Sequence, residues 1–363
     1  MPITKDQIYD QLRKVNDPDL HRDIVTLNMV KHVAYQDGHV KLTIELTTPA
    51  CPLKDVIQAD VEKAIHQLGD EIKQIEIEFT ANVQGAKPQD KAKDNNPLPD
   101  IKNIIAVGAG KGGVGKSTIA VNVAVGLARS GAAVGLMDGD IYGPSLPTLL
   151  GLEGIAPKAD GNMILPFVTA GIKSITLGAL VEPEKPLIWR GPMAHGAFKQ
   201  LATQTLWGEL DYLIIDLPPG TGDVPLTMSQ LLPLTGAVIV CTPQKVAQDD
   251  ARRAVRMFQQ LGIDILGVVE NMSYFIGDDG KEYDIFGRGG AEMMAQEMSL
   301  PFLGTIPINM ALRRHGDAGD PTLNFTNDTK LAEELDAVVG KLAAQISVHH
   351  LSGQHQQPTL TVN

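Results

Sequence analysis

A glycine-rich segment between a predicted strand and a predicted helix constrains this chain most. Residues 110–117 read Gly-Lys-Gly-Gly-Val-Gly-Lys-Ser, after the apolar run 104–107 and before apolar residues at helical spacing over 117–129. The segment fits the pattern G-x-x-x-x-G-K-[ST], in which glycines let several backbone N–H groups point at one phosphate. A glycine-rich structural turn is the alternative, but it does not account for the strand and helix on either side. The sequence therefore predicts a phosphate-binding loop.

The positions of this loop have distinct expected roles. Lys116 is expected to reach the β- and γ-phosphates of a nucleotide, and Ser117 to ligate Mg²⁺. The helix N-terminus adds a partial positive charge. We therefore expect ATP and Mg²⁺ as cofactors, with hydrolysis of ATP. The nucleotide-binding residues predicted here are Gly110, Lys111, Gly112, Gly113, Val114, Gly115, Lys116, Ser117 and Thr118.

The rest of the C-terminal part alternates short apolar runs with loops and helical patterns. This alternation predicts an α/β fold, a mostly parallel P-loop NTPase sheet with helices on both faces and ligands beyond the carboxyl ends of the strands. The apolar runs are 104–107, 134–137, 212–215, 237–241, 265–269 and 302–306.

The chain divides into two modules joined by a linker. Residues 85–100 read GAKPQDKAKDNNPLPD, a proline-rich and charged stretch typical of a flexible linker. Residues 1–84 combine helical and alternating patterns and predict a small α+β domain. Residues 101–346 form the predicted ATPase domain, and residues 347–363 a disordered polar tail.

Composition limits the classes of partner and compartment. The net charge of −12 argues against a general nucleic-acid binder, because phosphate contacts need clustered Lys and Arg. Two distant cysteines make a disulfide framework implausible and favour a reducing cytoplasm. The N-terminus has no apolar signal region and no apolar run reaches membrane-spanning length, so we expect no membrane association and a cytoplasmic location.

An acidic strand end follows the pattern of a magnesium site. The apolar run 212–215 leads into Asp216-Leu-Pro-Pro-Gly220. Asp216 is expected to hold Mg²⁺ through Ser117 or a water, and the N–H of Gly220 to contact the γ-phosphate and so sense whether it is present.

The loop resembles the deviant Walker A group, the MinD/ParA/nitrogenase-iron-protein class, because Lys111 follows the first glycine. The resemblance implies an ATP-sandwich homodimer in which Lys111 reaches the partner's nucleotide; a solvated loop lysine is the alternative. It also implies that Asp140 positions the attacking water, with Lys111 and Lys116 as the other catalytic residues. Asp138 is expected nearer the metal, or else to cap the following turn, and Asn271 to read adenine through its amide.

Further motifs resemble the Mrp/ApbC branch, whose members are described as iron–sulfur cluster carriers. They are GKGGVGKS, DGDIYGPS, WRGPM, DLPPGTGD, TPQ and ENMSYF, and the N-terminal module resembles the PaaD-like domain of iron–sulfur assembly proteins through DPD and TTPACP. The resemblance implies ATP-assisted transfer of clusters to apoprotein acceptors. However, carriers usually have C-x-x-C shortly after NMSYF, and residues 276–287 here contain no cysteine.

Because the C-x-x-C pair is missing, the sequence does not decide whether this chain carries an iron–sulfur cluster. Cys51 lies in a turn just before a helix, where a thiol can have a lowered pKa, and is the candidate iron–sulfur ligand, with a structural role as the alternative. Cys241 is expected to be a buried core residue. Other functions remain: a nucleotide-gated scaffold, or a MinD/ParA-type positioning ATPase, which the acidic helix 330–346 disfavours.

Overall fold

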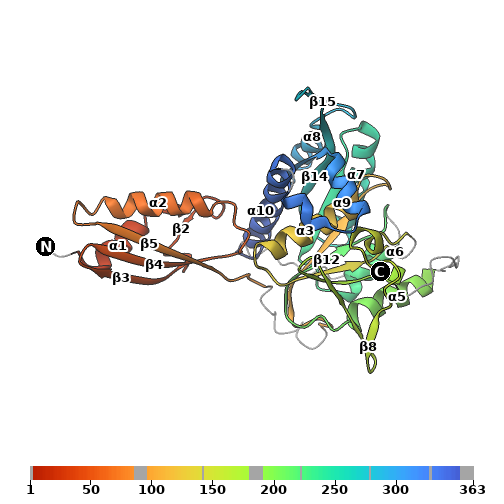
Figure 1. Ribbon diagram of the computed structural model, residues 1–363, viewed down its shortest axis with the longest axis horizontal. Coiled ribbons are helices and arrows are strands. Elements are labelled where there is room, and N and C mark those ends of the chain that lie inside the picture. The colour runs from red at the N-terminus through yellow and green to blue at the C-terminus, as the bar shows by residue number, and fades with distance from the viewer. Residues whose placement is uncertain are drawn as a thin grey trace.

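The computed structural model describes residues 3–85, 96–140, 143–179, 191–220, 223–277, 279–326 and 329–351. A small N-terminal domain and a larger C-terminal domain lie end to end in an elongated molecule (Figure 1). Most of the predicted linker, residues 86–95, lies outside the described residues. Among the described helices, none is long and apolar enough to cross a membrane.

The N-terminal domain packs two helices against a three-stranded sheet, as the α+β prediction requires. In the sheet, β4 pairs antiparallel with β3 and parallel with β5. A capping box opens α1, because Thr4 and Gln7 exchange hydrogen bonds between their side chains and backbone N–H groups. The elements are α1 (Lys5–Leu12), β1 (Asn16–Asp17), β2 (Arg22–Asp23), β3 (Val30–Gln36), β4 (His39–Leu46), α2 (Lys54–His66) and β5 (Gln74–Ala81).

The C-terminal domain is built on a nine-stranded sheet of the described residues. Its order is β10-β11-β7-β12-β6-β13-β14-β15, with β16 also paired to β14. Only the edge pairs β10–β11 and β14–β15 are antiparallel. All six predicted apolar runs are parallel strands of this sheet. The strands are β6 (Ile101–Gly108), β7 (Val134–Asp138), β10 (Phe167–Thr169), β11 (Ile172–Ile175), β12 (Leu210–Asp216), β13 (Gly236–Cys241), β14 (Ile265–Ile276), β15 (Glu282–Tyr283) and β16 (Phe302–Ile308), beside a separate hairpin of β8 (Lys158–Asp160) and β9 (Met163–Leu165).

Helices cover both faces of this sheet, as expected for parallel strands that are apolar on both sides. One core lies under α3, α4, α9 and α10, and the other under α5, α6, α7 and α8. On α7, buried Ala251, Val255 and Phe258 form the face that packs on the sheet. The helices are α3 (Lys116–Arg129), α4 (Leu146–Leu149), α5 (Gly191–Thr203), α6 (Asp223–Leu231), α7 (Lys245–Gln260), α8 (Gly290–Glu297), α9 (Met310–Asp317) and α10 (Thr329–Leu351), with short 3₁₀ turns η1 (Leu177–Ala179) and η2 (Pro321–Phe325).

The small domain docks on the amino ends of the parallel strands, through its β4–α2 loop. The Tyr212 hydroxyl, near the start of β12, donates to Thr48 Oγ1 over 3.3 Å. Gly340 of α10 lies so close that a Cβ there would be 3.0 Å from the Cβ of Pro52. Asn103 of β6 donates its amide to the carbonyl oxygen of Gln84, at 3.0 Å. The predicted linker therefore begins at a point that is already fixed to the large domain.

One predicted boundary is wrong. Residues 347–351, assigned to a disordered tail, continue α10 to Leu351. The side chain of His350 shares a 2.6 Å hydrogen bond with Asn103 Oδ1, and the side chain of Ser347 is buried. The polar composition of this segment is explained by polar contacts at the end of the helix rather than by exposure. Residues 352–363 of the predicted tail lie outside the described residues.

Candidate nucleotide-binding site

A cavity of about 490 Å³ lies at the carboxyl ends of the central strands, on the side opposite the docked small domain. The glycine-rich loop between β6 and α3 forms one wall, and the segment between β7 and the end of α4 forms another. Its lining residues are Lys111, Gly112, Gly113, Gly115, Lys116, Ser117, Thr118, Asp140, Pro144, Ser145, Thr148, Leu149 and Pro219. The volume lies in the range of small-molecule sites.

The glycine-rich loop curls because two of its residues have left-handed backbone conformations. Gly113 and Gly115 have φ of +81° and +82°, a region in which side chains other than glycine are strained. Gly115 caps the N-terminus of α3, so the loop delivers backbone N–H groups and the positive end of the helix to one place. This is the phosphate-binding geometry that the sequence predicts.

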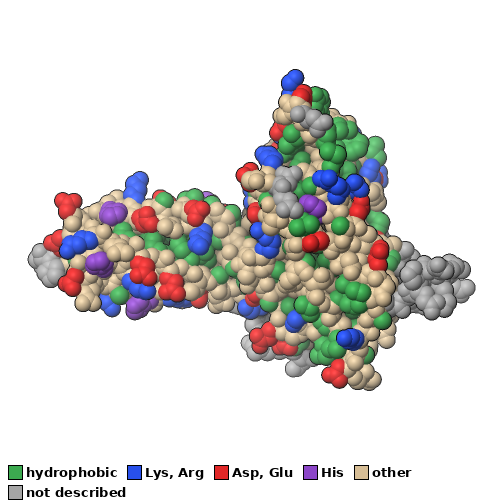
Figure 2. Space-filling view, viewed as in Figure 1, with side chains coloured by type: hydrophobic (Ala, Val, Ile, Leu, Met, Phe, Trp, Pro, Cys, Tyr) green, Lys and Arg blue, Asp and Glu red, His purple; other side chains and the backbone are tan. Residues whose placement is uncertain are grey.

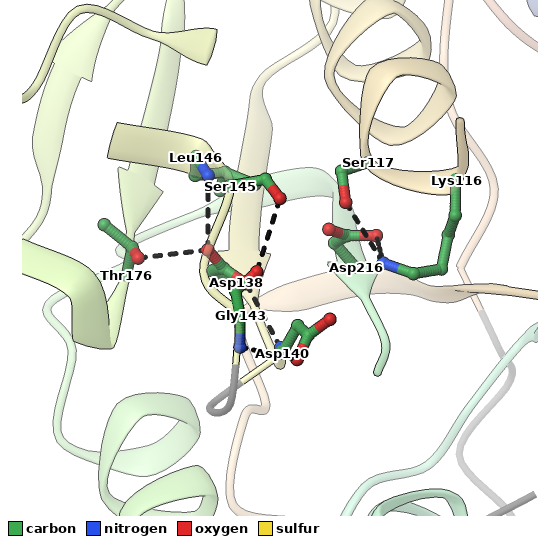
Figure 3. Close-up of polar contacts among 9 residues, drawn as sticks. All are labelled: Lys116, Ser117, Asp138, Asp140, Gly143, Ser145, Leu146, Thr176 and Asp216. Atoms are coloured by element: carbon green, nitrogen blue, oxygen red, sulfur yellow. Dashed lines mark hydrogen bonds and ion pairs between the residues drawn. The ribbon is translucent and has the colours of Figure 1, made fainter. Parts of the chain in front are cut away.

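Lys116 and Asp216 meet beneath the loop (Figure 3). Lys116 Nζ forms a short ion pair with Asp216 Oδ1 and lies 3.2 Å from Ser117 Oγ. Both charged side chains are buried, and the other carboxylate oxygen of Asp216, Oδ2, has no hydrogen-bond partner among the described residues. Burial raises the pKa of Asp216, and the Lys116 ammonium opposes that rise.

The unpartnered oxygen fits a magnesium site. A buried polar atom without a partner is costly, and a carboxylate oxygen beside a serine hydroxyl is a donor set that Mg²⁺ accepts. Mg²⁺ commonly uses one or two protein ligands together with substrate phosphates, which here would occupy the adjacent cavity. Ser117 and Asp216 therefore fit the expected ion.

Asp138 organises the loop that carries Asp140 (Figure 3). Its oxygens accept hydrogen bonds from the backbone N–H of Asp140 at 3.1 Å, the N–H of Leu146 at 3.3 Å and the hydroxyl of Thr176 at 3.0 Å. Burial, with a contribution from the charge of Asp216, raises the pKa of Asp138 to about 7. These contacts are those of the turn-capping alternative. Asp140, by contrast, lines the cavity.

Three other predicted residues lie in the loop or against it. Lys111 lines the cavity and is partly exposed. The N–H of Gly220 donates to the carbonyl oxygen of Ala109 at 3.0 Å, so contact with a γ-phosphate would require this bond to be exchanged. The amide nitrogen of Asn271 donates to the carbonyl oxygen of Val114 at 2.8 Å, and its side chain is buried rather than part of the cavity lining.

Some lining residues were not singled out from the sequence. Thr148, Leu149 and Pro219 reach the cavity because α4 and the segment after β12 fold over the loop. Their only local signal is position, since each follows an acidic strand end within a dozen residues.

Comparison with known proteins agrees with this geometry. Residues 100–343 match the family described as NUBPL iron-transfer P-loop NTPase. The chain belongs to this family. Residues 5–77 match a second family, described as iron-sulfur cluster assembly protein, which covers the small domain. The two matched ranges correspond to the two domains of the fold.

Relatives of this family include proteins of nearly the same length. The iron-sulfur cluster carrier protein of Synechocystis sp. is 47% identical over 95% of this chain and 99% of that protein. That of Escherichia coli K12 is 39% identical over 91% of this chain and 89% of that protein. Among solved structures, the nucleotide-binding protein from Archaeoglobus fulgidus in complex with ADP is 36% identical, with a TM-score of 0.58, and covers 68% of this chain and 96% of that protein.

Neither cysteine of this family member lies at the nucleotide cavity. Cys51 lies in the β4–α2 loop, which docks at the opposite ends of the strands, and burial raises the pKa of its thiol. The expectation of a lowered pKa is wrong, because desolvation exceeds the effect of the backbone hydrogen bond from Leu53. Cys241 is a buried core residue, as predicted, and burial raises its pKa to about 12.

The segment that would carry C-x-x-C forms a projecting hairpin. It runs from the end of β14 through β15, at the tip of the C-terminal domain (Figure 1). Ile276, Tyr283, Ile285 and Phe286 are exposed there, and Figure 2 shows hydrophobic side chains gathered over this part of the surface. Within the described residues, no group of three or more His, Cys, Asp or Glu side chains could hold a metal ion.

Proposed function

We propose that this protein is an ATPase that assists the binding and transfer of iron–sulfur clusters to apoprotein acceptors. The observation that carries the proposal is the buried Lys116–Asp216 pair beneath a phosphate-binding loop, in a chain whose relatives are iron-sulfur cluster carrier proteins. The matched small domain supports the same reading, since its family is an iron-sulfur cluster assembly family.

The cavity supports hydrolysis of ATP by water. A water attacks the γ-phosphorus, the bond from that phosphorus to the β,γ-bridging oxygen breaks, and ADP and phosphate leave. Lys116 would leave Asp216 to contact the transferred phosphoryl oxygens, where negative charge is stabilised in the transition state. Asp140 would orient the water, and the contacts of Asp138 would hold Asp140 in place. Mg²⁺, held by Ser117 and Asp216, would neutralise phosphate charge.

Lys111 supports a dimeric form of this enzyme. Its side chain lines the cavity at a position that ordinary phosphate loops leave unspecified. We propose that it contacts the nucleotide of a second copy of the chain in a homodimer. Lys111→Ala should then bind MgATP as the wild type does and lose the part of hydrolysis that rises with protein concentration. Turnover of Lys111→Ala that equals wild type at all concentrations would exclude this role.

Asn271 is proposed to read adenine as well as to contact the loop. An amide has two N–H donors and one oxygen acceptor, and the bond to Val114 uses one donor. The second N–H and the oxygen are the groups that can recognise the adenine edge. Preference for ATP over GTP should therefore fall in Asn271→Ala.

Reconstitution experiments with cysteine variants test whether the protein carries an iron–sulfur cluster. Anaerobic reconstitution with iron and sulfide should produce cluster absorbance that an acceptor apoprotein removes. Cys51→Ser should lower the amount of bound cluster, whereas Cys241→Ser, in the buried core, serves as the control. If no cluster absorbance develops in the protein or in its mixture with an acceptor, the carrier role fails.

A nucleotide-gated scaffold is the second candidate, and the absence of cysteine from residues 276–287 favours it. Four thiolates are the usual requirement for a [4Fe–4S] cluster, and one chain offers two distant thiols. A scaffold would bind an assembly partner in a nucleotide-dependent way without iron. Nucleotide-dependent partner binding by Cys51→Ser without iron would support it.

A further inference from the structure

Strand β14 ends its pairing with β13 at Glu270, and its backbone is irregular just beyond that point. Its pairing with β16 shifts between Asn271 and Phe275, where four steps along β14 match two along β16. Within this interval Met272 has φ of +57°, which is strained for a side chain other than glycine. The strand then continues into the projecting hairpin with β15. The irregular segment thus joins the sheet to the hairpin.

One side chain of this segment holds the phosphate-binding loop. Asn271 donates to the carbonyl oxygen of Val114 at 2.8 Å and is 3% exposed. A Cβ at Gly115 would lie 2.1 Å from the Asn271 amide nitrogen, so the loop backbone and this amide are in direct contact. The buried bond fixes the peptide immediately before the residue that caps α3.

The preceding side chain holds the base of the hairpin. Glu270 is fully buried, and its two carboxyl oxygens accept three hydrogen bonds. The donors are the hydroxyl of Ser273 at 2.5 Å, the N–H of Gly289 at 2.9 Å and the N–H of Ala291 at 2.7 Å. Gly289 is the N-cap of α8, where the chain returns from the hairpin. Glu270 therefore ties both ends of the hairpin together.

The hairpin beyond this base is internally connected. Phe275 pairs with Tyr283, and the guanidinium of Arg288 lies 4.5 Å from the ring centre of Tyr274 while it pairs with Glu282. The Tyr274 hydroxyl donates to Glu334 of α10 at 2.8 Å. A shift at residues 270–273 is therefore passed to the hairpin as a unit rather than absorbed by a loose loop.

We propose that Glu270 and Asn271 are positioning residues that couple the nucleotide cavity to the β14–β15 hairpin. Adjacent on one strained strand segment, Glu270 holds the hairpin base and Asn271 holds the phosphate-binding loop. Nucleotide on the loop then changes the hairpin, and changes at the hairpin base alter nucleotide affinity by the same factor, since coupling is reciprocal. This inference rests on the proposed nucleotide binding, and it assigns the coupling to β14 rather than to the loops after β7 and β12.

Hydrogen exchange of the full-length protein tests whether nucleotide on the loop changes the hairpin. MgADP or Mg-AMP-PNP should change the exchange rates of amides in 273–277 and 279–289 by about fivefold or more in the wild type. Asn271→Ala should bind MgADP more weakly, because the same amide is proposed to read adenine, and should lose this response even at MgADP concentrations that calorimetry shows to be saturating. Asn103→Ala removes a buried amide at the other end of the same sheet and should keep it. If Asn271→Ala is not folded by circular dichroism, Asn271→Ser, which is too short to reach Val114, replaces it.

A double-mutant cycle tests whether changes at the hairpin base alter nucleotide affinity through Asn271. Ser273→Ala removes a donor to Glu270 and should change MgADP affinity in the wild-type background but not in Asn271→Ala. A merely structural role would give additive effects. Unchanged hairpin exchange in a wild type that binds MgADP, a full response in Asn271→Ala, or additivity overturns the coupling and leaves the proposed function intact. A wild type that binds no MgADP overturns the proposed function, and this inference with it.

Discussion

Lys116 Nζ contacts Asp216 Oδ1 in a buried ion pair between the start of α3 and the end of β12, with 7% and 0% of the two side chains exposed. The two residues that are expected to hold phosphate and magnesium thus neutralise each other. Charges buried together in this way are tolerated because each satisfies the other. When nucleotide and Mg²⁺ bind, Lys116 would pair with phosphate and Asp216 with Mg²⁺, so two pairings would replace the one between Lys116 and Asp216.

Lys116→Ala should lower ATP turnover by at least about a hundredfold, because a cation facing developing phosphate charge is lost. It should also lower the free energy of unfolding by about 3 kcal/mol, since Asp216 is left buried without its partner. Phosphate release and urea unfolding measure the two effects. Lys102→Ala, which breaks an exposed pair with Asp211, is the control and should change neither by much. Normal turnover by Lys116→Ala would refute the site.

The pH dependence of stability should report Asp138. Its pKa is raised from 3.8 to about 7 in the folded chain. Between these values the folded chain binds more protons than the unfolded chain, so the free energy of unfolding should fall as pH rises from about 4 to about 7, by up to roughly 4 kcal/mol from this group. Urea unfolding in EDTA measures it.

Asp138→Asn should flatten that pH profile, because the amide does not titrate. Asp160→Asn, at an exposed position of β8, should leave the profile as in the wild type. A profile equally steep in Asp138→Asn would show that another group is responsible.

Gly115→Ala should destabilise the nucleotide-free protein more than Gly113→Ala. Both positions have φ near +80°, so each substitution costs about 1–2 kcal/mol of backbone strain. Only at Gly115 does a Cβ also meet a neighbour, 2.1 Å from Asn271, whereas nothing lies within 4 Å of it at Gly113. Thermal unfolding compares the two variants. Equal losses of thermal stability in the two variants would mean that Asn271 moves away from the added Cβ at little energetic cost.

Gly340→Val should release the small domain. Its side chain would collide with Pro52, because a Cβ alone already lies 3.0 Å from the Pro52 Cβ. Small-angle scattering should show a larger radius of gyration and a more flexible molecule. Ala337→Val, on the exposed face of the same helix, should leave the scattering unchanged. ATP turnover should persist in both variants, since the junction lies at the opposite ends of the strands from the cavity.

The fold and most of the candidate site were predictable from local pattern. Six apolar runs became parallel strands, because burial on both faces selects continuous apolar segments. The spacing of glycines, Lys116 and Ser117 predicted the loop, because its geometry depends on few neighbouring residues. Strand β3 was not singled out, since its exposed polar positions weaken the alternation. The end of α10 was missed because the bond between His350 and Asn103 joins residues that are 247 positions apart.

The sequence by itself determined the phosphate-binding loop, the parallel sheet and the two modules, since each follows from residue types and spacing along a short stretch. Only the tertiary structure decided the partners of the buried polar groups. It paired Lys116 with Asp216, gave Asp138 to the loop of Asp140 and placed Asn271 on Val114. It also placed Cys51 at the far ends of the strands, with a raised pKa. Burial and hydrogen-bond satisfaction depend on residues distant in sequence, which no local pattern encodes.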